Sequence, residues 1–251
     1  MNYYMRFSIE LKFVSPKAKP VKLKIRYQEA FLYLLKSGLS HVDPNLFSYL
    51  YRKNTPKLFC LAANFPDATF YADSITLGEK NNAYWQLSTA DAKLGLSFYN
   101  TLMYLYKNGP WPFGKCLKVM FGSPFQIKEP VIVTNEIKVK TLSPLVVRKD
   151  KRLFLSGTKD ANLEQFNQVL QGNMQSRFKN YYPKEISHMI ENMTYLPIKT
   201  RKTVIKTFDI NIESTVGVFS LTADPVLLSL LVKNGLGIRT GSFSGCLKVI
   251  H

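Results

Sequence analysis

The sequence predicts an α+β fold of two tandem ferredoxin-like (RRM-like) βαββαβ domains, the first over residues 1–125 and the second over residues 126–251. Two observations support this prediction. Segments in which apolar and polar residues alternate, as in a half-buried strand, are interspersed with segments whose apolar residues recur at helical spacing. They follow one another in the order strand, helix, strand, strand, helix, strand, and the second half repeats that order loosely.

The first domain is expected to open with a strand at residues 6–14, where apolar and polar residues alternate. Helical spacing follows over residues 27–35, and Gly38 is expected to end that helix. Asp43 and Pro44 predict an additional short helix, because aspartate caps a helix N-terminus and proline suits the first helical position. The remaining expected elements are strands at residues 57–63, 69–77, 84–88 and 117–121 and a long helix at residues 90–106.

The second domain is expected to repeat the plan, although the two halves share negligible sequence identity. Asp224 and Pro225 open its last helix by the same Asp-Pro device. A glycine-rich loop and a final strand follow that helix. The other expected elements are an extended run at residues 129–141, a short strand at 152–155, helices at 163–181 and 183–193, and a hairpin of strands at 198–212 and 216–221.

Charge is the most informative feature of the composition. Lysine and arginine number 34 against 17 aspartate and glutamate, which gives a net charge of +17. This excess indicates a polyanionic partner, with nucleic acid ahead of an anionic membrane, because the expected helices are not especially basic. Aromatic residues make up 13% of the chain, and tyrosines interleaved with cations suit an RNA surface on which bases stack. The alternative is that most of these aromatics are core residues.

The cellular setting is inferred from features that the sequence lacks. It has no run of about 18 apolar residues that would predict a transmembrane helix, and its N-terminus lacks the layout of a signal peptide. Its three cysteines, Cys60, Cys116 and Cys246, are isolated and lack metal-ligand spacing. We therefore expect a cytoplasmic protein without disulfides, membrane partners or a bound metal.

The segment near the C-terminus is rich in glycine and carries three cations. Its four glycines fall within eleven residues and are Gly235, Gly237, Gly241 and Gly245. The cations among or beside them are Lys233, Arg239 and Lys248. A glycine loop with exposed amides and cations is suited to binding phosphate oxygens, so these seven residues are candidate RNA-binding residues. The alternative is a glycine-rich turn that precedes the last strand.

Three motifs carry a resemblance to a known family. They are, in chain order, Pro-Lys-Leu-Phe at residues 56–59, Leu-Ser-Pro-Leu-Val-Val at residues 142–147 and the terminal glycine loop. The chain thereby resembles the CRISPR repeat-processing endoribonucleases, tandem ferredoxin-fold proteins of the repeat-associated mysterious protein superfamily. The resemblance implies metal-independent cleavage of the precursor RNA within its repeats, with no cofactor. The ribose 2′-hydroxyl attacks the neighbouring phosphate and leaves a 2′,3′-cyclic phosphate and a 5′-hydroxyl.

The same resemblance suggests catalytic residues. His41 follows the first helix, where several relatives place a catalytic histidine, and an imidazole is the usual acid or base of catalysis at neutral pH. Lys57 would steady the developing phosphorane charge, and Tyr33 would position the scissile phosphate. Some relatives have their histidine on the second helix, where this chain has Tyr51, a poor base at neutral pH. The structural alternatives are a loop histidine, a strand-edge lysine and a core aromatic.

One departure concerns the loop, whose second glycine triplet reads Phe243-Ser-Gly245 in place of Gly-hydrophobic-Gly. The expected partner is CRISPR repeat RNA, with other CRISPR effector subunits as further candidates and with a monomer or homodimer as the assembly. Two alternatives to an endonuclease stay open at this point. One is a member that binds repeat RNA without cutting it, and the other is a general basic RNA-binding protein.

Overall fold

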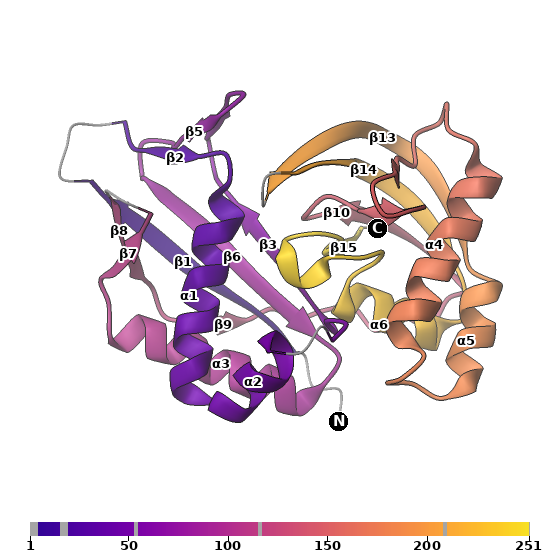
Figure 1. The fold of residues 1–251 in the computed structure, drawn as a ribbon, viewed down its shortest axis with the longest axis horizontal. Helices are drawn as coiled ribbons and strands as arrows, with labels where there is room; N and C mark the ends of the chain where they lie inside the picture. Colours follow the sequence, from indigo (N-terminus) through magenta and orange to yellow (C-terminus); the bar gives the residue numbers. More distant parts are fainter. Residues whose placement is uncertain (1–4, 16–19, 53–54, 115–116, 208–209, 251) are drawn as a thin grey trace.

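The structure is a computed structural model that describes residues 5–15, 20–52, 55–114, 117–207 and 210–250. Figure 1 shows two α+β halves side by side, each with helices packed against a β-sheet. Cys116 lies outside the described residues, whereas Cys60 and Cys246 are free and buried. Within the described ranges, no helix is long and apolar enough to cross a membrane.

The first half has the strand order of a ferredoxin-like fold. Its main antiparallel sheet runs β3-β6-β1-β8-β7, so the four principal strands stand in the order second, third, first, fourth. The strands are β1 (Arg6–Val14), β3 (Phe59–Asn64), β6 (Asn82–Thr89), β7 (Trp111–Phe113), β8 (Leu117–Phe121) and β9 (Phe125–Gln126), which pairs with β1. The helices are α1 (Tyr27–Val42), α2 (Pro44–Tyr51) and α3 (Ala92–Lys107).

The sequence predicted one strand of the main sheet at residues 69–77, and the structure differs from this prediction. It contains β4 (Thr69–Phe70) and β5 (Ser74–Thr76), which pair with each other, and β5 also pairs with β2 (Lys22–Lys24) to complete a small separate sheet. The amide of Tyr71 donates to the carbonyl of Ser74, which closes the turn between them. The segment cannot pair with that edge of β6, because all of β3 already pairs with it.

Helix α1 does not end at Gly38, which corrects the expected boundary. The helix continues to Val42, and a Cβ on Gly38 would lie 2.9 Å from Thr101 Cγ2 of α3. The glycine therefore allows α1 and α3 to pack closely and does not cap the helix. The expected cap of α2 is confirmed, since Asp43 Oδ1 accepts a hydrogen bond of 3.0 Å from the amide of Leu46.

The second half repeats the ferredoxin-like order, with its four-stranded sheet running β13-β14-β10-β15. Its main strands are β10 (Glu136–Thr141), β13 (Thr194–Thr207), β14 (Ile210–Thr222) and β15 (Leu247–Ile250), and a small sheet pairs β11 (Val147–Arg148) with β12 (Phe154–Leu155). The helices are α4 (Leu163–Phe178), α5 (Lys184–Glu191) and α6 (Pro225–Asn234). Tandem ferredoxin-like folds are thus confirmed, while the division after residue 125 stays a prediction.

Several boundaries in the second half differ from expectation, and the largest differences concern its first strand and its hairpin. The extended run expected from residue 129 becomes a strand only at Glu136. The hairpin of β13 and β14 is longer than expected, because residues 213–215 are paired strand and the connection falls at residues 208–209, outside the described residues. Asp224 caps α6 as predicted, with its Oδ1 accepting from the amide of Val226 at 2.8 Å.

Each half places a side chain inside the other. Phe243, from the glycine-rich segment, belongs to the apolar core of the first half, where its ring stacks on Trp85 and lies 5.4 Å from the ring of Phe31. In return, the guanidinium of Arg6 on β1 donates to the carbonyls of Val232 and Leu247 in the second half. The yellow segment between α6 and β15 in Figure 1 therefore connects the two halves.

Candidate active site and nucleic-acid interface

Lys57 lies where the glycine-rich segment meets the first half. The hydroxyl of Thr240 donates to the Lys57 carbonyl at 3.3 Å, and a Cβ on Gly241 would lie 2.8 Å from Lys57 Cγ. Both loop residues belong to η1 (Thr240–Ser242), the short helical turn that contacts β3. The structure therefore brings together two motifs that were predicted separately, Pro-Lys-Leu-Phe and the glycine loop.

The ammonium group of Lys57 is held at the end of α2. It donates to the carbonyls of Leu50 and Thr55, the latter at 2.8 Å, and to Thr55 Oγ1 at 3.3 Å. A cation at the C-terminal turn of a helix is favourable, because the last carbonyls lack intrahelical donors. Partial burial and the neighbouring charge of Lys36 lower the pKa of Lys57.

Tyr51 lies between two lysines. Its ring centroid is 4.9 Å from Lys36 Nζ and 5.4 Å from Lys57 Nζ. Its hydroxyl is buried and has no hydrogen-bond partner among the described atoms, and burial raises its pKa well above the ordinary value. The hydroxyl therefore stays protonated at neutral pH, which strengthens the expectation that Tyr51 is a poor base.

His41 lies in the last turn of α1, not in a loop after it, because α1 continues past Gly38. The exposed imidazole stacks on Tyr104 of α3, with ring centroids 4.3 Å apart and an interplanar angle of 23°. The described contacts of His41 and those of Lys57 share no residue. The structure thus does not bring the two predicted catalytic groups into contact.

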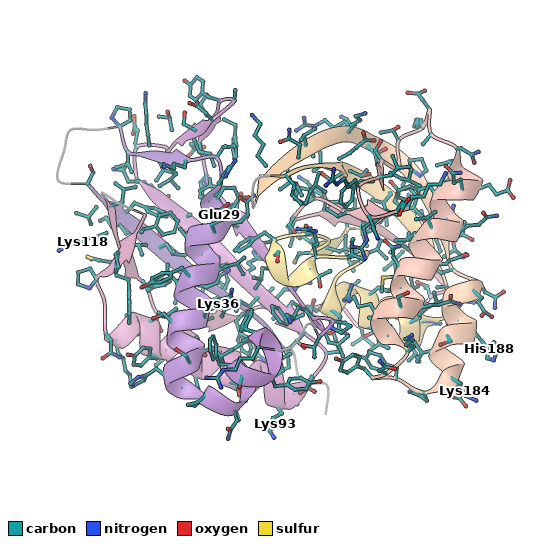
Figure 2. The ribbon with its side chains drawn as sticks, in the orientation of Figure 1. Glu29, Lys36, Lys93, Lys118, Lys184 and His188 are labelled. Atoms are coloured by element: carbon teal, nitrogen blue, oxygen red, sulfur yellow. The ribbon has the colours of Figure 1, made fainter. Side chains whose placement is uncertain are left out.

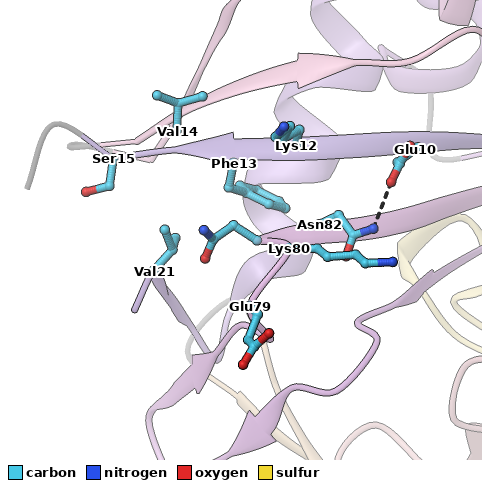
Figure 3. Close-up of a pocket in the computed structure, with 10 residues that line it drawn as sticks. Glu10, Lys12, Phe13, Val14, Ser15, Val21, Glu79, Lys80 and Asn82 are labelled. Atoms are coloured by element: carbon cyan, nitrogen blue, oxygen red, sulfur yellow. Dashed lines mark hydrogen bonds between the residues drawn. The ribbon is translucent and has the colours of Figure 1, made fainter. Parts of the chain in front are cut away.

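Tyr33 is 60% exposed, so the alternative of a core aromatic does not hold. It lines a pocket of about 680 Å³ together with Lys22, Lys24 and Pro112. Figure 3 shows a second pocket, of about 510 Å³, near the end of β1, where the Asn82 amide donates to the Glu10 carboxylate at 2.7 Å. That pocket mixes acidic and basic side chains and includes no predicted site residue.

The four glycines of the loop are buried, and their conformation accounts for their identity. Gly235, Gly237 and Gly245 have positive φ angles of 83°, 77° and 64°. A Cβ on Gly245 would overlap the carbonyl oxygen of Leu236, whose own amide donates to the Gly245 carbonyl at 2.9 Å. The glycines thus have a structural explanation, and RNA contact by this loop stays a prediction that rests on its cations.

The predicted cations occupy different surroundings. Lys233 lies in the last turn of α6. Arg239 is half-buried, with φ at 57°, and burial together with the charge of Arg148 lowers its pKa. Lys248 lies on β15 directly opposite Lys140 of β10, and both side chains are exposed. Like charges in register on one sheet face repel each other, so this pair favours a bound anion.

Two buried arginines that the sequence reasoning missed hold the glycine segment in place. Arg177 of α4 donates to the carbonyls of Asn234, Gly235 and Gly237 at 2.6, 3.0 and 2.8 Å, and burial lowers its pKa to about 10. Arg6 forms an ion pair with Glu129 at 2.9 Å besides its two carbonyl contacts. The signal for Arg177 was present, because it continues the apolar stripe of α4 at helical spacing.

A resident metal has no obvious ligand set in the part of the chain that the structure describes, where no three or more His, Cys, Asp or Glu side chains are grouped to hold one. The polar groups gathered at the junction are instead lysines, tyrosines and arginines. Such groups can bind phosphate oxygens and stack on bases.

Comparison with known proteins gives a family for the second half and a fold for the whole chain. Residues 127–249 match the family described as CRISPR associated protein Cas6, C-terminal. A solved RAMP protein binding different RNA substrates is 17% identical, with 98% of this chain and 99% of that chain covered and a TM-score of 0.77. A Cas6-related gene product from Pyrococcus furiosus is 15% identical, with the same coverage and a TM-score of 0.76.

A third solved structure, a Cas6 product complex, is 17% identical, with 98% of this chain and 99% of that chain covered and a TM-score of 0.65. At these identities the likeness establishes the fold and no more. No curated protein matches the chain in sequence. The resemblance drawn from the sequence motifs is therefore confirmed by the family match and by the fold.

Proposed function

Since residues 127–249 match the Cas6 C-terminal family, we propose that this chain is an endoribonuclease that cuts CRISPR precursor RNA within its repeats. The family match is the observation that carries the proposal. The product complex among the structures of the same fold supports it, as does the net charge of +17, which suits an RNA ligand. A cytoplasmic location, together with the precursor RNA, is part of the same proposal.

The proposed reaction is attack of a ribose 2′-hydroxyl on the adjacent phosphate, without a metal or other cofactor. It produces a 2′,3′-cyclic phosphate and a 5′-hydroxyl, and it requires a base, an acid and a cation near the phosphate. His41 is the proposed acid or base, because it is an exposed imidazole, and an imidazole is the side chain that most often transfers protons in catalysis. Tyr33 and Lys57 complete the proposed set.

The RNA is proposed to lie over the junction of the two halves. Exposed or half-exposed cations of the glycine segment and of the second half support this path, among them Arg239 beside Arg148 and Lys248 beside Lys140. Phosphate contacts of this kind make affinity fall steeply with salt. A flat salt response of repeat-RNA binding would contradict the proposed path.

One observation favours a second candidate function, binding of repeat RNA without cutting. His41 contacts Tyr104, whereas Lys57 contacts α2 and η1, and the Tyr51 hydroxyl is held protonated. If RNA does not bring His41 to the phosphate, the described residues around Lys57 offer no suitable base there. It would then serve as an RNA-binding subunit beside other CRISPR effector proteins.

Cleavage of a cognate repeat RNA in EDTA separates the two candidates. The comparison uses the wild type, His41→Ala, and His188→Ala as a matched control, because His188 is another exposed helical histidine and lies on α5 (Figure 2). We expect cyclic-phosphate products from the wild type and from His188→Ala, and almost none from His41→Ala. Equal cleavage by all three proteins would remove His41 from the mechanism, and binding without any cleavage would establish the second candidate.

A further inference from the structure

The surface of α1 carries a lysine to which neither the sequence motifs nor the proposed mechanism assigns a role. Lys36 is exposed near the middle of α1 (Figure 2), and its ammonium group lies over the ring of Tyr51. Lys57 approaches the same ring from the end of α2. The described ion pairs include no carboxylate bound to either lysine, so two positive charges meet at one tyrosine without a compensating anion.

The two lysines differ in which of their donors are free. A lysine ammonium has three donors, and those of Lys57 are directed at Leu50 O, Thr55 O and Thr55 Oγ1. A phosphate bound by Lys57 would have to displace one of these acceptors. The described hydrogen bonds use none of the donors of Lys36, so its full set is available to a ligand.

The ring of Tyr51 limits where the Lys36 ammonium lies. A cation over an aromatic face is attracted to the negative face of the ring, which favours this placement over the many rotamers of a free lysine. Repulsion from Lys57 opposes the placement, and a bound anion would relieve that repulsion. The Lys36 ammonium group is thus held over the Tyr51 ring with its hydrogen-bond donors free, and the ammonium group of Lys57 lies near the same ring.

We infer that Lys36 binds a phosphodiester group of the RNA, with the ring of Tyr51 holding its ammonium group and Lys57 anchoring that ring to the end of α2. The inference deepens the proposed function and rests on it for the identity of the ligand. It assigns an additional phosphate contact to Lys36, and it gives Lys57, besides its proposed part in cleavage, a contact with the ring of Tyr51.

The test is the salt dependence of RNA binding. The probe is a repeat RNA from the genome that encodes this chain, with the 2′-hydroxyl at the cleaved position replaced by hydrogen, titrated at several salt concentrations. Loss of one phosphate contact makes the slope of log affinity against log salt about 0.7–0.9 less negative. We expect this change in Lys36→Gln together with a several-fold loss of affinity at low salt, and recovery in Lys36→Arg.

A control variant makes the result specific. Lys184→Gln removes an exposed lysine from α5 on the other half and should keep the wild-type slope (Figure 2). A wild-type slope in Lys36→Gln, or an equal change of slope in Lys184→Gln, would overturn the inference.

The binding test does not depend on catalysis. If the wild type never cuts, unmodified repeat RNA replaces the deoxy probe, and the slopes are compared in the same way. Failure of the proposed cleavage is thereby distinguished from failure of the Lys36 site.

Discussion

The hydroxyl of Thr240 donates to the carbonyl of Lys57 at 3.3 Å although 183 positions separate the two residues in the sequence, and the next residue, Gly241, faces the Lys57 side chain. A Cβ on Gly241 would lie 2.8 Å from Lys57 Cγ and 3.0 Å from both Lys57 Cβ and Phe59 Cζ. The missing side chain at position 241 therefore determines where Lys57 can lie, and with it the end of α2 and the ring of Tyr51. The glycine segment of one half thus shapes the candidate site of the other.

Gly241→Ala is expected to displace Lys57 and to weaken both stability and repeat-RNA cleavage. The added methyl group overpacks the junction, which costs about 1–3 kcal/mol in the free energy of unfolding. Gly172→Ala is the control, because Gly172 lies in α4 and a Cβ there would have no atom within 4 Å. In a helix, that control should raise stability by up to about 1 kcal/mol. Equal free energies of unfolding in urea and equal cleavage rates for Gly241→Ala and Gly172→Ala would contradict this explanation.

Gly245→Ala is expected to lower the free energy of unfolding by more than the cost of placing alanine at a positive φ, because its methyl group would also overlap a neighbouring carbonyl. Gly245 combines a φ of 64° with a position whose Cβ would overlap the carbonyl of Leu236. Gly114 has a φ of 66° and open space around its Cα, so Gly114→Ala isolates the conformational cost, about 1–2 kcal/mol. We expect Gly245→Ala to cost at least about 3 kcal/mol in urea denaturation. Equal losses would mean that the loop moves away from Leu236 freely.

Phe243→Ala tests whether the glycine segment is fixed by its anchor in the first half. Truncating a buried phenylalanine costs about 3–5 kcal/mol, and the lost contacts here include Phe31 and Trp85 across the junction. Phe125→Ala is the matched control, because Phe125 on β9 is half exposed. Faster amide hydrogen exchange at Leu236 and Ile238 is expected only in Phe243→Ala. Unchanged exchange there would show that Arg6 and Arg177 hold the segment without the phenylalanine.

The sequence predicted those features that short-range chemistry determines. Asp43 and Asp224 cap helices as expected, because a capping carboxylate needs only the next few amides of its own chain. Gly38 was misjudged, since a glycine that ends a helix and one that lets two helices approach look the same in sequence, and the difference lies in Thr101 of α3. The segment at residues 69–77 was misplaced because its partner, β2, is distant in the chain.

The candidate site shows the same limit. The motifs predicted Lys57 and the glycine loop as site residues, but the proximity of the two depends on how the two halves pack. Phe243 was noted only as a departure from a glycine triplet, and its burial in the opposite core could not be inferred without that packing. The helical spacing of Arg177 in the apolar stripe of α4 indicates burial, but its carbonyl partners, like the aromatic partner of Lys36, depend on how the chain packs.

The pKa of Lys57 is expected to rise when the charge of Lys36 is removed. Burial is the larger cause of its lowered pKa and Lys36 the second, so Lys36→Gln should recover part of the shift. Titration of the Lys57 side chain by NMR with labelled lysine measures this directly. Lys184→Gln is the control and should leave the Lys57 pKa where it is in the wild type.

The sign of the stability effect follows from proton binding. Between the lowered pKa of folded Lys57 and its ordinary value of 10.5, the unfolded chain holds more protons, so the free energy of unfolding rises with pH in that window. The contribution is fully present above 10.5 and is lost as pH falls through the folded-state pKa. In Lys36→Gln the folded-state pKa of Lys57 moves closer to its ordinary value, so the pH range between the two becomes narrower. The rise of the free energy of unfolding at alkaline pH should therefore be smaller than in Lys184→Gln. An unchanged Lys57 pKa in Lys36→Gln would mean that the two ammonium groups do not interact through the ring of Tyr51.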